Sequence, residues 1–349
     1  MGFTAFGGPL AIIAQIQRDL VDKQKLITEE EFKKSLALIK TLPGPTAAQV
    51  LTFIAYRLGG FWTAFFSLSF FILPSALMMV GLAIYYDKFR ANAEILNLLE
   101  GMQAGAFVLI VMALYSLTKG NFTQNRFWVL FVISLLVLGP LKIFEPFVII
   151  GAGVFSLFLN FKPRPLKLSS YISLDLFLIC LKAGGLAFGT GFAILPLLQK
   201  DFVEVQHWVT KDQFMDALSF GQLTPGPISV TVTFVGYRLA GWLGALVATV
   251  GIFLPGFFNM TTWFPRAYNW FSRQVWVKSF SVGATAAIAA GIVIVLLSLL
   301  ETIRGPQLII PFLLLGLSFR RNIPSWALVV ISGLSWWLVS HAILEKSLL

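Results

Sequence analysis

Long runs of hydrophobic residues dominate the chain, and short polar segments separate them. Several runs exceed the roughly 20 residues that a helix needs to cross a bilayer core. They are apolar on every face, whereas a membrane-spanning β-strand would alternate over about 10 residues. The pattern therefore predicts an all-α, polytopic membrane protein. The runs cover residues 61–86, 96–117, 127–139, 146–161, 174–198, 242–264, 279–300, 308–319 and 326–344.

The composition agrees with this prediction and narrows the choice of partners. Hydrophobic residues make up 57% of the chain and charged residues 12%, against about 25% charged residues in soluble domains. The net charge of +10 comes from Lys and Arg scattered over short loops. Nucleic-acid binding would call for a basic stripe on one face. We therefore expect a lipid bilayer as the surroundings and no nucleic-acid partner.

The chain has few residues of the types that catalyse reactions or bind metal ions. Cys180 is the single cysteine, and His207 and His341 lie far apart. We find no disulfide framework, no cluster with metal-ligand spacing and no nucleophile paired with a base. The sequence predicts no cofactor, no metal and no enzymatic activity.

The chain contains two copies of one unit. When the second half is aligned with the first at an offset of 182 residues, Asp19 matches Asp201, and Pro43-Gly44-Pro45 matches Pro225-Gly226-Pro227. The second copy then lacks one residue, so the offset falls to 181. At that offset Tyr56-Arg57-Leu58 matches Tyr237-Arg238-Leu239. Two hydrophobic segments of similar composition will align leucine with leucine by chance, but chance does not explain these motifs at matched spacing. We expect repeats at 1–165 and 170–349, joined by the polar, proline-rich stretch 162–170.

The two copies differ at their start. The second copy carries "LDLFLICLKAGGLA" before its Phe-Gly motif, whereas the first has only "MGFTA". We expect that about a dozen residues of the first helix are absent, through a misassigned start or a truncation. The alternative is a natural short form whose first helix does not span the membrane.

The number of times each repeat crosses the membrane decides whether the two repeats are inverted or parallel. If residues 18–60 and 200–241 are excursions that return to the same side, each repeat crosses five times and the repeats are inverted. The loops then divide into a side with 17 Lys and Arg residues and a side with 8, and the first should be cytoplasmic. If the segment after each Pro-Gly-Pro crosses alone, the repeats are parallel.

Four matched motifs interrupt the hydrophobic runs: "FGGP" at 6–9, "FGTG" at 188–191 and the two Pro-Gly-Pro sites. Proline and paired glycines break a helix, which then restarts with free N–H groups and the positive end of its dipole at the break. Such helix starts bind anions. Interrupted segments at corresponding positions of two halves point to a transporter's substrate site. The alternative is that Gly and Pro only permit a kink or close packing.

The substrate-binding candidates are the break residues and the polar side chains beside them. Arg57 and Arg238 end the matched segments, where snorkelling to the headgroups is the alternative to an anion-gating role. Thr46, Ser229 and Thr231 are further hydroxyl donors near the turns. The candidates are Phe6, Gly7, Gly8, Pro9, Lys40, Pro43, Gly44, Pro45, Gln49, Arg57, Gly189, Thr190, Gly191, Gln222, Thr224, Pro225, Gly226, Pro227 and Arg238.

Three charged residues are candidates for coupling transport to protons. Asp19 and Asp201 recur at matched positions, and Lys182 lies inside the hydrophobic "LICLKAGG". A charge within a membrane segment is a functional hypothesis by default. Asp175, two helical turns away, is a candidate partner for Lys182. Thr28 and Thr210, each three residues before Glu31 or Gln213, predict N-caps of helices in the two excursions.

The ordered motifs of both copies resemble the chromate ion transporter family. They read "FGGPLAIIAQIQRDLV", "LITEEEF", "LPGPTAAQ" and "AYRLGGFW" in the first copy, and "FGTGFAILPLLQKDFV", "WVTKDQF", "TPGPISVTVTFVGYRLAGW" in the second. The resemblance covers nearly the whole chain. It implies a two-domain chromate transporter of the cell membrane that exports the anion from the cytoplasm by proton antiport.

Several alternatives stay open. Sulfate shares the charge and tetrahedral shape of chromate, so the substrate is chromate or a sulfate-type oxyanion. The same scaffold fits a passive anion channel, and a membrane-embedded enzyme or a noncatalytic assembly subunit are further interpretations. A homodimer is also left open.

Overall fold

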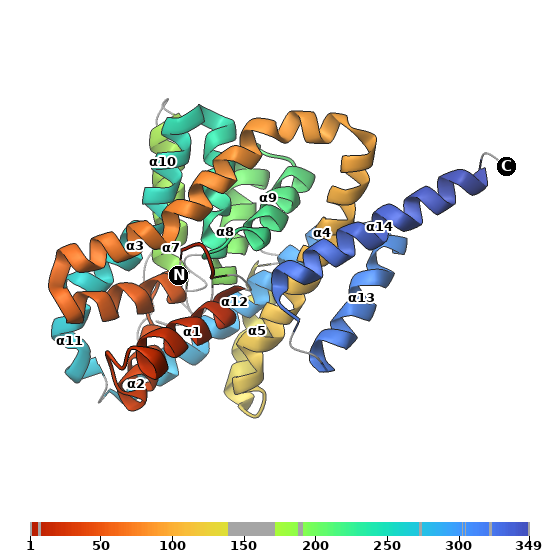
Figure 1. The fold of residues 1–349 in the computed structure, drawn as a ribbon. Helices are drawn as coiled ribbons and strands as arrows, with labels where there is room; N and C mark the ends of the chain where they lie inside the picture. The colour runs from red at the N-terminus through yellow and green to blue at the C-terminus, as the bar shows by residue number, and fades with distance from the viewer. Residues whose placement is uncertain are drawn as a thin grey trace.

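The structure is a computed structural model, and it describes residues 2–5, 8–138, 172–187, 191–271, 274–301, 303, 305–320 and 323–347. Helices form all of its regular structure in these ranges, and no described residue lies in a β-strand, which confirms the all-α prediction (Figure 1). The longer helices are α1 (Gly8–Gln17), α2 (Glu29–Ile39), α3 (Thr46–Ala91), α4 (Ala93–Thr118), α5 (Asn125–Leu138), α7 (Ile172–Leu186), α9 (Lys211–Leu223), α10 (Thr231–Thr261), α11 (Phe264–Phe271), α12 (Val275–Leu300), α13 (Gly305–Arg320) and α14 (Ser325–Ser347).

Short helical segments connect these elements. Two of them are π-helices, η1 and η4, and both directly follow an α-helix. The segments are η1 (Arg18–Lys23), η2 (Lys119–Asn121), η3 (Gly191–Ile194), α8 (Leu195–Gln199), η4 (Lys200–Val205) and η5 (Ile228–Val230).

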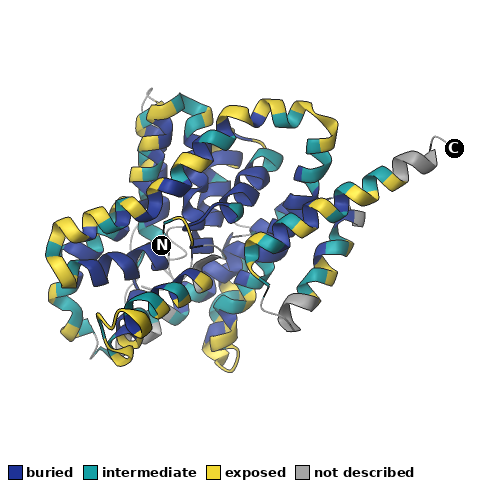
Figure 2. Cartoon of the chain, viewed as in Figure 1, coloured by how far each residue is buried: buried dark blue, intermediate teal, exposed yellow. Residues whose placement is uncertain are grey.

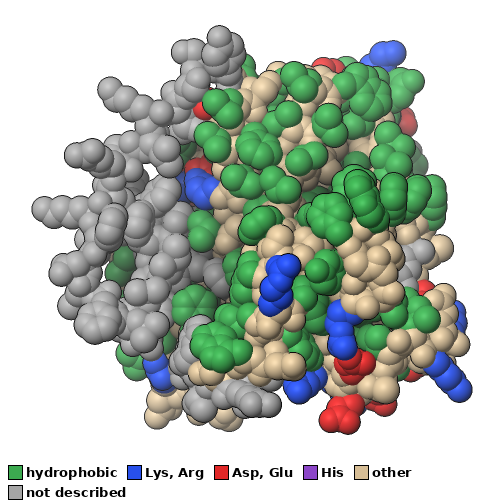
Figure 3. Space-filling model, turned by 90° about the vertical axis from the view of Figure 1, so that its left-hand side faces the viewer, with side chains coloured by type: hydrophobic (Ala, Val, Ile, Leu, Met, Phe, Trp, Pro, Cys, Tyr) green, Lys and Arg blue, Asp and Glu red, His purple; other side chains and the backbone are tan. Residues whose placement is uncertain are grey.

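Among the described residues, five helical stretches are long and apolar enough to cross a membrane: Thr46–Ala91, Ala93–Asn121, Ile228–Thr261, Val282–Leu300 and Ser325–Ala342. They coincide with predicted hydrophobic runs, and α5 and α13 cover two further runs. The run at 146–161 lies outside the described residues. Hydrophobic side chains crowd the face formed by α3 and α10, and charged side chains gather toward its lower edge (Figure 3). The helices confirm a multi-pass membrane protein.

The first excursion is a hairpin that returns to its own entrance, and we call residues 29–58 hairpin 1. It consists of α2, the Pro-Gly-Pro turn and the first half of α3, which ends where Gly59 and Gly60 leave helical geometry; Gly60 has φ +72°. Arg57, at the end of this half-helix, pairs with Glu31 at the start of α2. Hairpin 1 therefore makes no net crossing, as predicted.

The second excursion repeats this design, and we call residues 211–239 hairpin 2. It consists of α9, the second Pro-Gly-Pro turn, η5 and the first half of α10, which ends at Ala240 and Gly241; Gly241 has φ +58°. The predicted N-caps are present in both hairpins. Thr28 accepts a hydrogen bond from the Glu31 N–H, and Thr210 forms a full capping box with Gln213.

The backbone conformation is the same at equivalent positions of the two repeats. Lys25 and His207, which are equivalent positions of the two copies, have positive φ values of 51° and 52°. Gly44 and Gly226, also equivalent, have positive φ values as well. The π-helices η1 and η4 match residue by residue at the same offset. Sequence patterns did not predict the π-helices, whose irregular hydrogen bonding leaves no periodic signal.

The two hairpins open toward opposite sides of the membrane, so the repeats are inverted. The second half of α3 leaves the mouth of hairpin 1 at Phe61 and rises for about 45 Å, more than the roughly 30 Å of a bilayer core. At its far end Asp87 pairs with Arg238, at the mouth of hairpin 2. In return, α11 brings Tyr268 to within 3.3 Å of Ser35 of hairpin 1.

The hairpins differ in burial. Residues 214–222 of α9 are all buried, because α9 packs against α4, α10 and α14. Only Phe32, Ser35 and Ile39 of α2 are buried. In Figure 2 the middle of the molecule around α9 is dark blue, whereas α2 at the lower left is largely exposed. The first arm of hairpin 2 is thus enclosed by helices of both repeats, and the first arm of hairpin 1 is largely open.

Candidate functional site

The tip of each hairpin docks on the Phe-Gly break of the other repeat. The Gly44 N–H donates to the carbonyl oxygen of Ala187 at 2.6 Å, and the Gly226 N–H donates to the carbonyl oxygen of Ala5 at 2.8 Å. Ala5 and Ala187 are themselves equivalent positions of the two repeats. The contacts form a reciprocal pair, so each Pro-Gly-Pro tip lies against the residue that directly precedes the Phe-Gly motif of the other repeat.

Both tips require glycine. Gly44 has φ +134° and Gly226 has φ +121°, a region in which other residues are strained. Space is also lacking: a Cβ on Gly44 would lie 2.4 Å from Gln49 Nε2, and a Cβ on Gly226 would lie 2.8 Å from Ser75 Oγ. The Pro-Gly-Pro motif therefore combines a helix break with a close approach between repeats.

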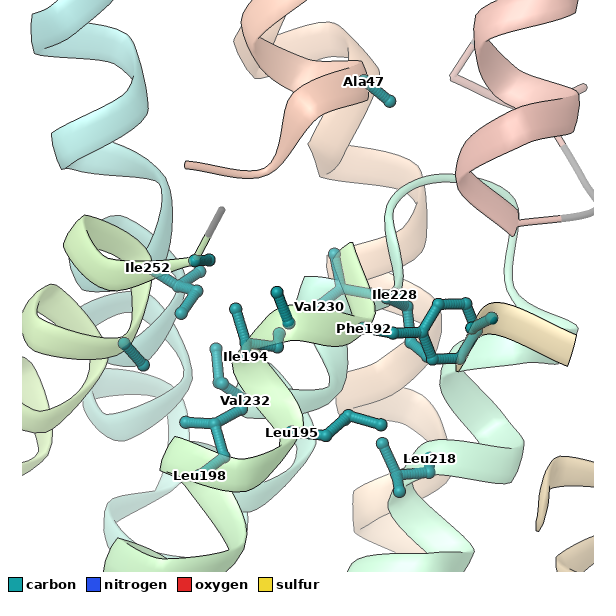
Figure 4. Packing of buried hydrophobic residues seen from close by; sticks show 14 of the residues in the cluster. Ala47, Phe192, Ile194, Leu195, Leu198, Leu218, Ile228, Val230, Val232 and Ile252 are labelled. Atoms are coloured by element: carbon teal, nitrogen blue, oxygen red, sulfur yellow. The ribbon is translucent and has the colours of Figure 1, made fainter. Parts of the chain in front are cut away.

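Helices restart directly after the tips. Thr46 opens α3, and Ile228 opens η5, which continues into α10. The first turn of a helix presents N–H groups without intrahelical acceptors. The short helix η3, which follows the second Phe-Gly break, packs against η5. Figure 4 shows Phe192 of η3 beside Ile228 of η5. The breaks thus meet in apolar surroundings, where electrostatic interactions are strong.

Polar atoms at these tips are buried without partners. Among the described residues, Gln222 Nε2 and Ser229 Oγ are buried and make no hydrogen bond. Both side chains are at most 4% exposed. A buried polar atom left unsatisfied calls for an explanation such as a bound ion or water. Two orphaned donors on either side of the second Pro-Gly-Pro turn fit a negatively charged guest.

The first tip is held by amides instead. The Pro43 carbonyl oxygen accepts hydrogen bonds from Gln49 Nε2 at 2.6 Å and from Asn259 Nδ2 of α10 at 3.1 Å. Trp263 Nε1 in turn donates to Asn259 Oδ1. Sequence reasoning selected Gln49 but missed Asn259, which belongs to the other repeat, far from Pro43 along the chain, and carries no motif.

The remaining substrate candidates do not lie together. Phe6, Gly7, Gly189 and Thr190 lie outside the described residues, whereas Gly8 and Pro9 open α1 and Gly191 opens η3. Lys40 and Thr224 cap the C-terminal ends of α2 and α9; Lys40 is exposed and Thr224 is buried. The structure places Pro45, Pro225 and Pro227 at the tips and Arg57 and Arg238 at the mouths.

Two coupling candidates form a pair that was not predicted. Lys182 of α7 pairs with Asp201 of η4, so the candidate pairing of Lys182 with Asp175 was wrong. Asp175 lies two helical turns away, and the chain folds back after the break at 188–191 to bring Asp201 closer. Burial raises the pKa of the Asp201 carboxyl, while the Lys182 cation acts in the opposite direction. The equivalent Asp19 pairs with Lys23 on the surface.

Other parts of the described chain make poor sites for an anion. A groove of ≈ 510 Å³ lies between the second halves of α3 and α10, but its lining is almost wholly apolar, as expected for a surface that faces lipid. The described residues contain no group of three or more His, Cys, Asp or Glu side chains arranged to hold a metal ion.

The sequence model of the chromate transporter family matches residues 1–157 and 174–337. The chain belongs to this family. The two matched segments agree with the two repeats seen in the backbone. This result also confirms the resemblance in the ordered motifs of both copies, and it places the chain in a family of transporters rather than of enzymes.

Similar proteins occur in several bacteria. The chain is 28% identical to the probable chromate transport protein of Synechococcus elongatus, over 96% of this chain and 92% of that protein. It is 31% identical to the chromate transport protein of Cupriavidus metallidurans, over 84% and 78%, and 27% identical to that of Pseudomonas aeruginosa, over 97% and 90%. No solved structure matches this chromate transporter family member.

Proposed function

We propose that this protein is a secondary transporter that carries chromate, or another tetrahedral oxyanion, across the cell membrane with coupling to protons. The observation that carries the proposal is the reciprocal docking of Gly44 on Ala187 and of Gly226 on Ala5. It sets the helix start at the tip of each repeat against the other repeat, and transporters of this architecture build a substrate site from such helix starts. The family and the relatives that are named chromate transport proteins support the choice of substrate.

The oxyanion would be held mainly by the second tip. Its negative oxygens would accept hydrogen bonds from Gln222 Nε2, Ser229 Oγ and the first N–H groups of η5 and α10. The helix dipole adds a partial positive charge at the same point. Lys40, exposed beside the first tip, supplies a cation that attracts anions from the water on the side of hairpin 1. The predicted repeat boundaries, 1–165 and 170–349, serve as the two proposed units.

Protons would be linked to the anion through Lys182 and Asp201. The pair straddles the break at 188–191, because Lys182 precedes it on α7 and Asp201 follows it on η4. The Asp201 carboxylate and an oxyanion compete for the same ammonium group. Protonation of Asp201 removes the competitor, so proton and anion occupancy depend on each other. Asp19 lacks this setting because its pair with Lys23 is exposed.

The test is uptake of labelled chromate into everted membrane vesicles, with sulfate as competitor and an imposed pH gradient. A proton-coupled transporter accumulates chromate against its gradient, and an uncoupler abolishes the accumulation. Vesicles without the protein are the first control. Vesicles with a Gly226→Leu variant, inserted at wild-type level, are the second.

Each alternative gives a different result in this assay. A passive channel equilibrates chromate without accumulating it and ignores the uncoupler. A sulfate-type carrier loses chromate uptake at low sulfate concentrations. An assembly subunit shows no uptake with either anion. Chemical conversion of the anion by the purified protein would indicate an enzyme. Any of these results would replace the proposal.

A further inference from the structure

A buried polar network fastens hairpin 2 to the first repeat. Asp216 lies on α9 and its side chain is fully buried. Asp216 Oδ2 accepts hydrogen bonds from the Tyr86 hydroxyl at 2.6 Å and from Arg90 Nε at 2.9 Å, and Oδ1 accepts one from Gln103 Nε2 at 2.8 Å. The donors belong to α3 and α4, so one carboxylate ties α9 to two helices of the other repeat.

The network is strong because its charges compensate each other away from water. The Arg90 guanidinium neutralises the Asp216 carboxylate, and both carboxylate oxygens have hydrogen-bond donors. Removing one partner of a buried ion pair leaves an uncompensated charge and is strongly destabilising. Arg238 adds to the contact: its guanidinium lies 5.2 Å from the centre of the Tyr86 ring and also pairs with Asp87.

Hairpin 1 has a neutral contact at the equivalent place. Tyr268 stacks on Phe53, and Tyr86 meets the equivalent Phe234 edge-on, so the two tyrosines contact matching positions of the hairpins. At the repeat offset, however, Lys34 stands where Asp216 stands. Lys34 Nζ lies 5.8 Å from the Tyr268 ring, and the Tyr268 hydroxyl meets only the Ser35 hydroxyl, at 3.3 Å, among the contacts of the described residues.

This chemical difference accompanies a difference in burial between the first arms of the hairpins: α9, with the ionic network, is enclosed, and α2, without it, is largely exposed. We propose that Asp216 is a gating residue of the transporter, and that its network with Arg90, Tyr86 and Gln103 keeps the hairpin-2 side of the substrate site closed until transport releases it. The inference rests on the proposed function only in treating the hairpins as gates.

The test measures access of a reagent from the hairpin-2 side. Ser219 is fully buried on α9, three residues from Asp216, and Ser219→Cys is a small change. The single native cysteine is removed with Cys180→Ala. Purified protein in liposomes is treated with a membrane-impermeant maleimide from each side in turn. We expect slow labelling of Cys180→Ala/Ser219→Cys, and labelling at least about tenfold faster from one side only when Asp216→Asn is added.

The matched control is Asp212→Asn, which makes the same charge change one turn earlier on α9, outside the network core. It should label at the parent rate, and Asp216→Glu should restore slow labelling, because it keeps the charge. If Asp216→Asn does not fold, Tyr86→Phe removes one hydrogen bond to Oδ2 and should accelerate labelling by a smaller factor. Labelling of Asp216→Asn, or failing that of Tyr86→Phe, at the parent rate would overturn the proposal.

The labelling requires no substrate. A protein that fails to accumulate chromate therefore still reports on the gate, and failure of the proposed function is distinguishable from failure of the gating role.

Discussion

The N–H of Gly44 lies 2.6 Å from the carbonyl oxygen of Ala187, and the equivalent glycine of the second repeat makes the same bond to Ala5. Each repeat thus supplies a tip to the other and receives one in return. Neither half contains a complete version of the proposed site.

Gly226→Ala is expected to reduce chromate transport by at least tenfold. The residue has φ +121°, where a side chain costs about 1–3 kcal/mol. Its new Cβ would also press on Ser75 Oγ, 2.8 Å away, and loosen the bond to Ala5. Uptake rates per inserted molecule in everted vesicles measure the effect.

The matched control for this glycine is Gly81→Ala. Gly81 lies in the helical part of α3 and a Cβ there meets nothing within 4 Å. The control should transport at the wild-type rate. Equal transport by Gly226→Ala and Gly81→Ala would show that the tip does not need its glycine.

Asp201→Asn is expected to abolish accumulation driven by a pH gradient and to spare exchange of labelled for unlabelled chromate. Without an ionisable group at this position the anion site still binds and reorients, but protons no longer drive it. Counterflow measured beside gradient-driven uptake separates the two. Asp19→Asn, which changes the equivalent, half-buried residue of the first repeat, is the control and should keep both activities. Loss of both activities in Asp201→Asn would assign Asp201 a structural role.

Lys182→Met is expected to move the pH profile of transport upward. Burial raises the pKa of Asp201 and the Lys182 cation lowers it. Removal of the cation therefore raises the pKa further, so that the carboxyl loses its proton only at higher pH. The midpoint of uptake rate against pH gives the shift. A downward shift, or an unchanged midpoint in an active variant, would contradict the proposed pairing.

Arg57→Gln and Glu31→Gln are expected to change transport by the same factor, and the double variant by no more than either. The two residues pair at the mouth of hairpin 1 and are partly exposed, so their contribution to stability is under about 1 kcal/mol. If Arg57 instead attracts the anion, Arg57→Gln slows uptake at low chromate concentrations whereas Glu31→Gln does not. Initial rates over a range of chromate concentrations distinguish these roles.

Local patterns in the sequence predicted much of this architecture. Hydrophobic runs located the spanning helices, matched motifs located the repeats, and proline with glycine located the breaks, because each feature depends on neighbours along the chain. The return of hairpin 1 on itself followed from an assumption about crossings, and Gly60 provides its physical cause.

Local sequence patterns could not predict contacts between residues that lie far apart along the chain. Asp216 meets Tyr86 and Gln103, 130 and 113 residues away. Helical periodicity shows which residues share a face but not which helix lies opposite. The choice of Asp175 for Lys182 failed for this reason, since it considered one helix alone and the partner came from beyond the break.

The second half of α3 is one rod with a different hairpin attached to each end. Through Gly60 it continues into the tip-bearing half-helix of hairpin 1, and through Tyr86 and Arg90 it grips hairpin 2. If the hairpins gate the site as proposed, a tilt of this rod would displace both entrances together. Opening toward one compartment and closing toward the other would then be a single movement.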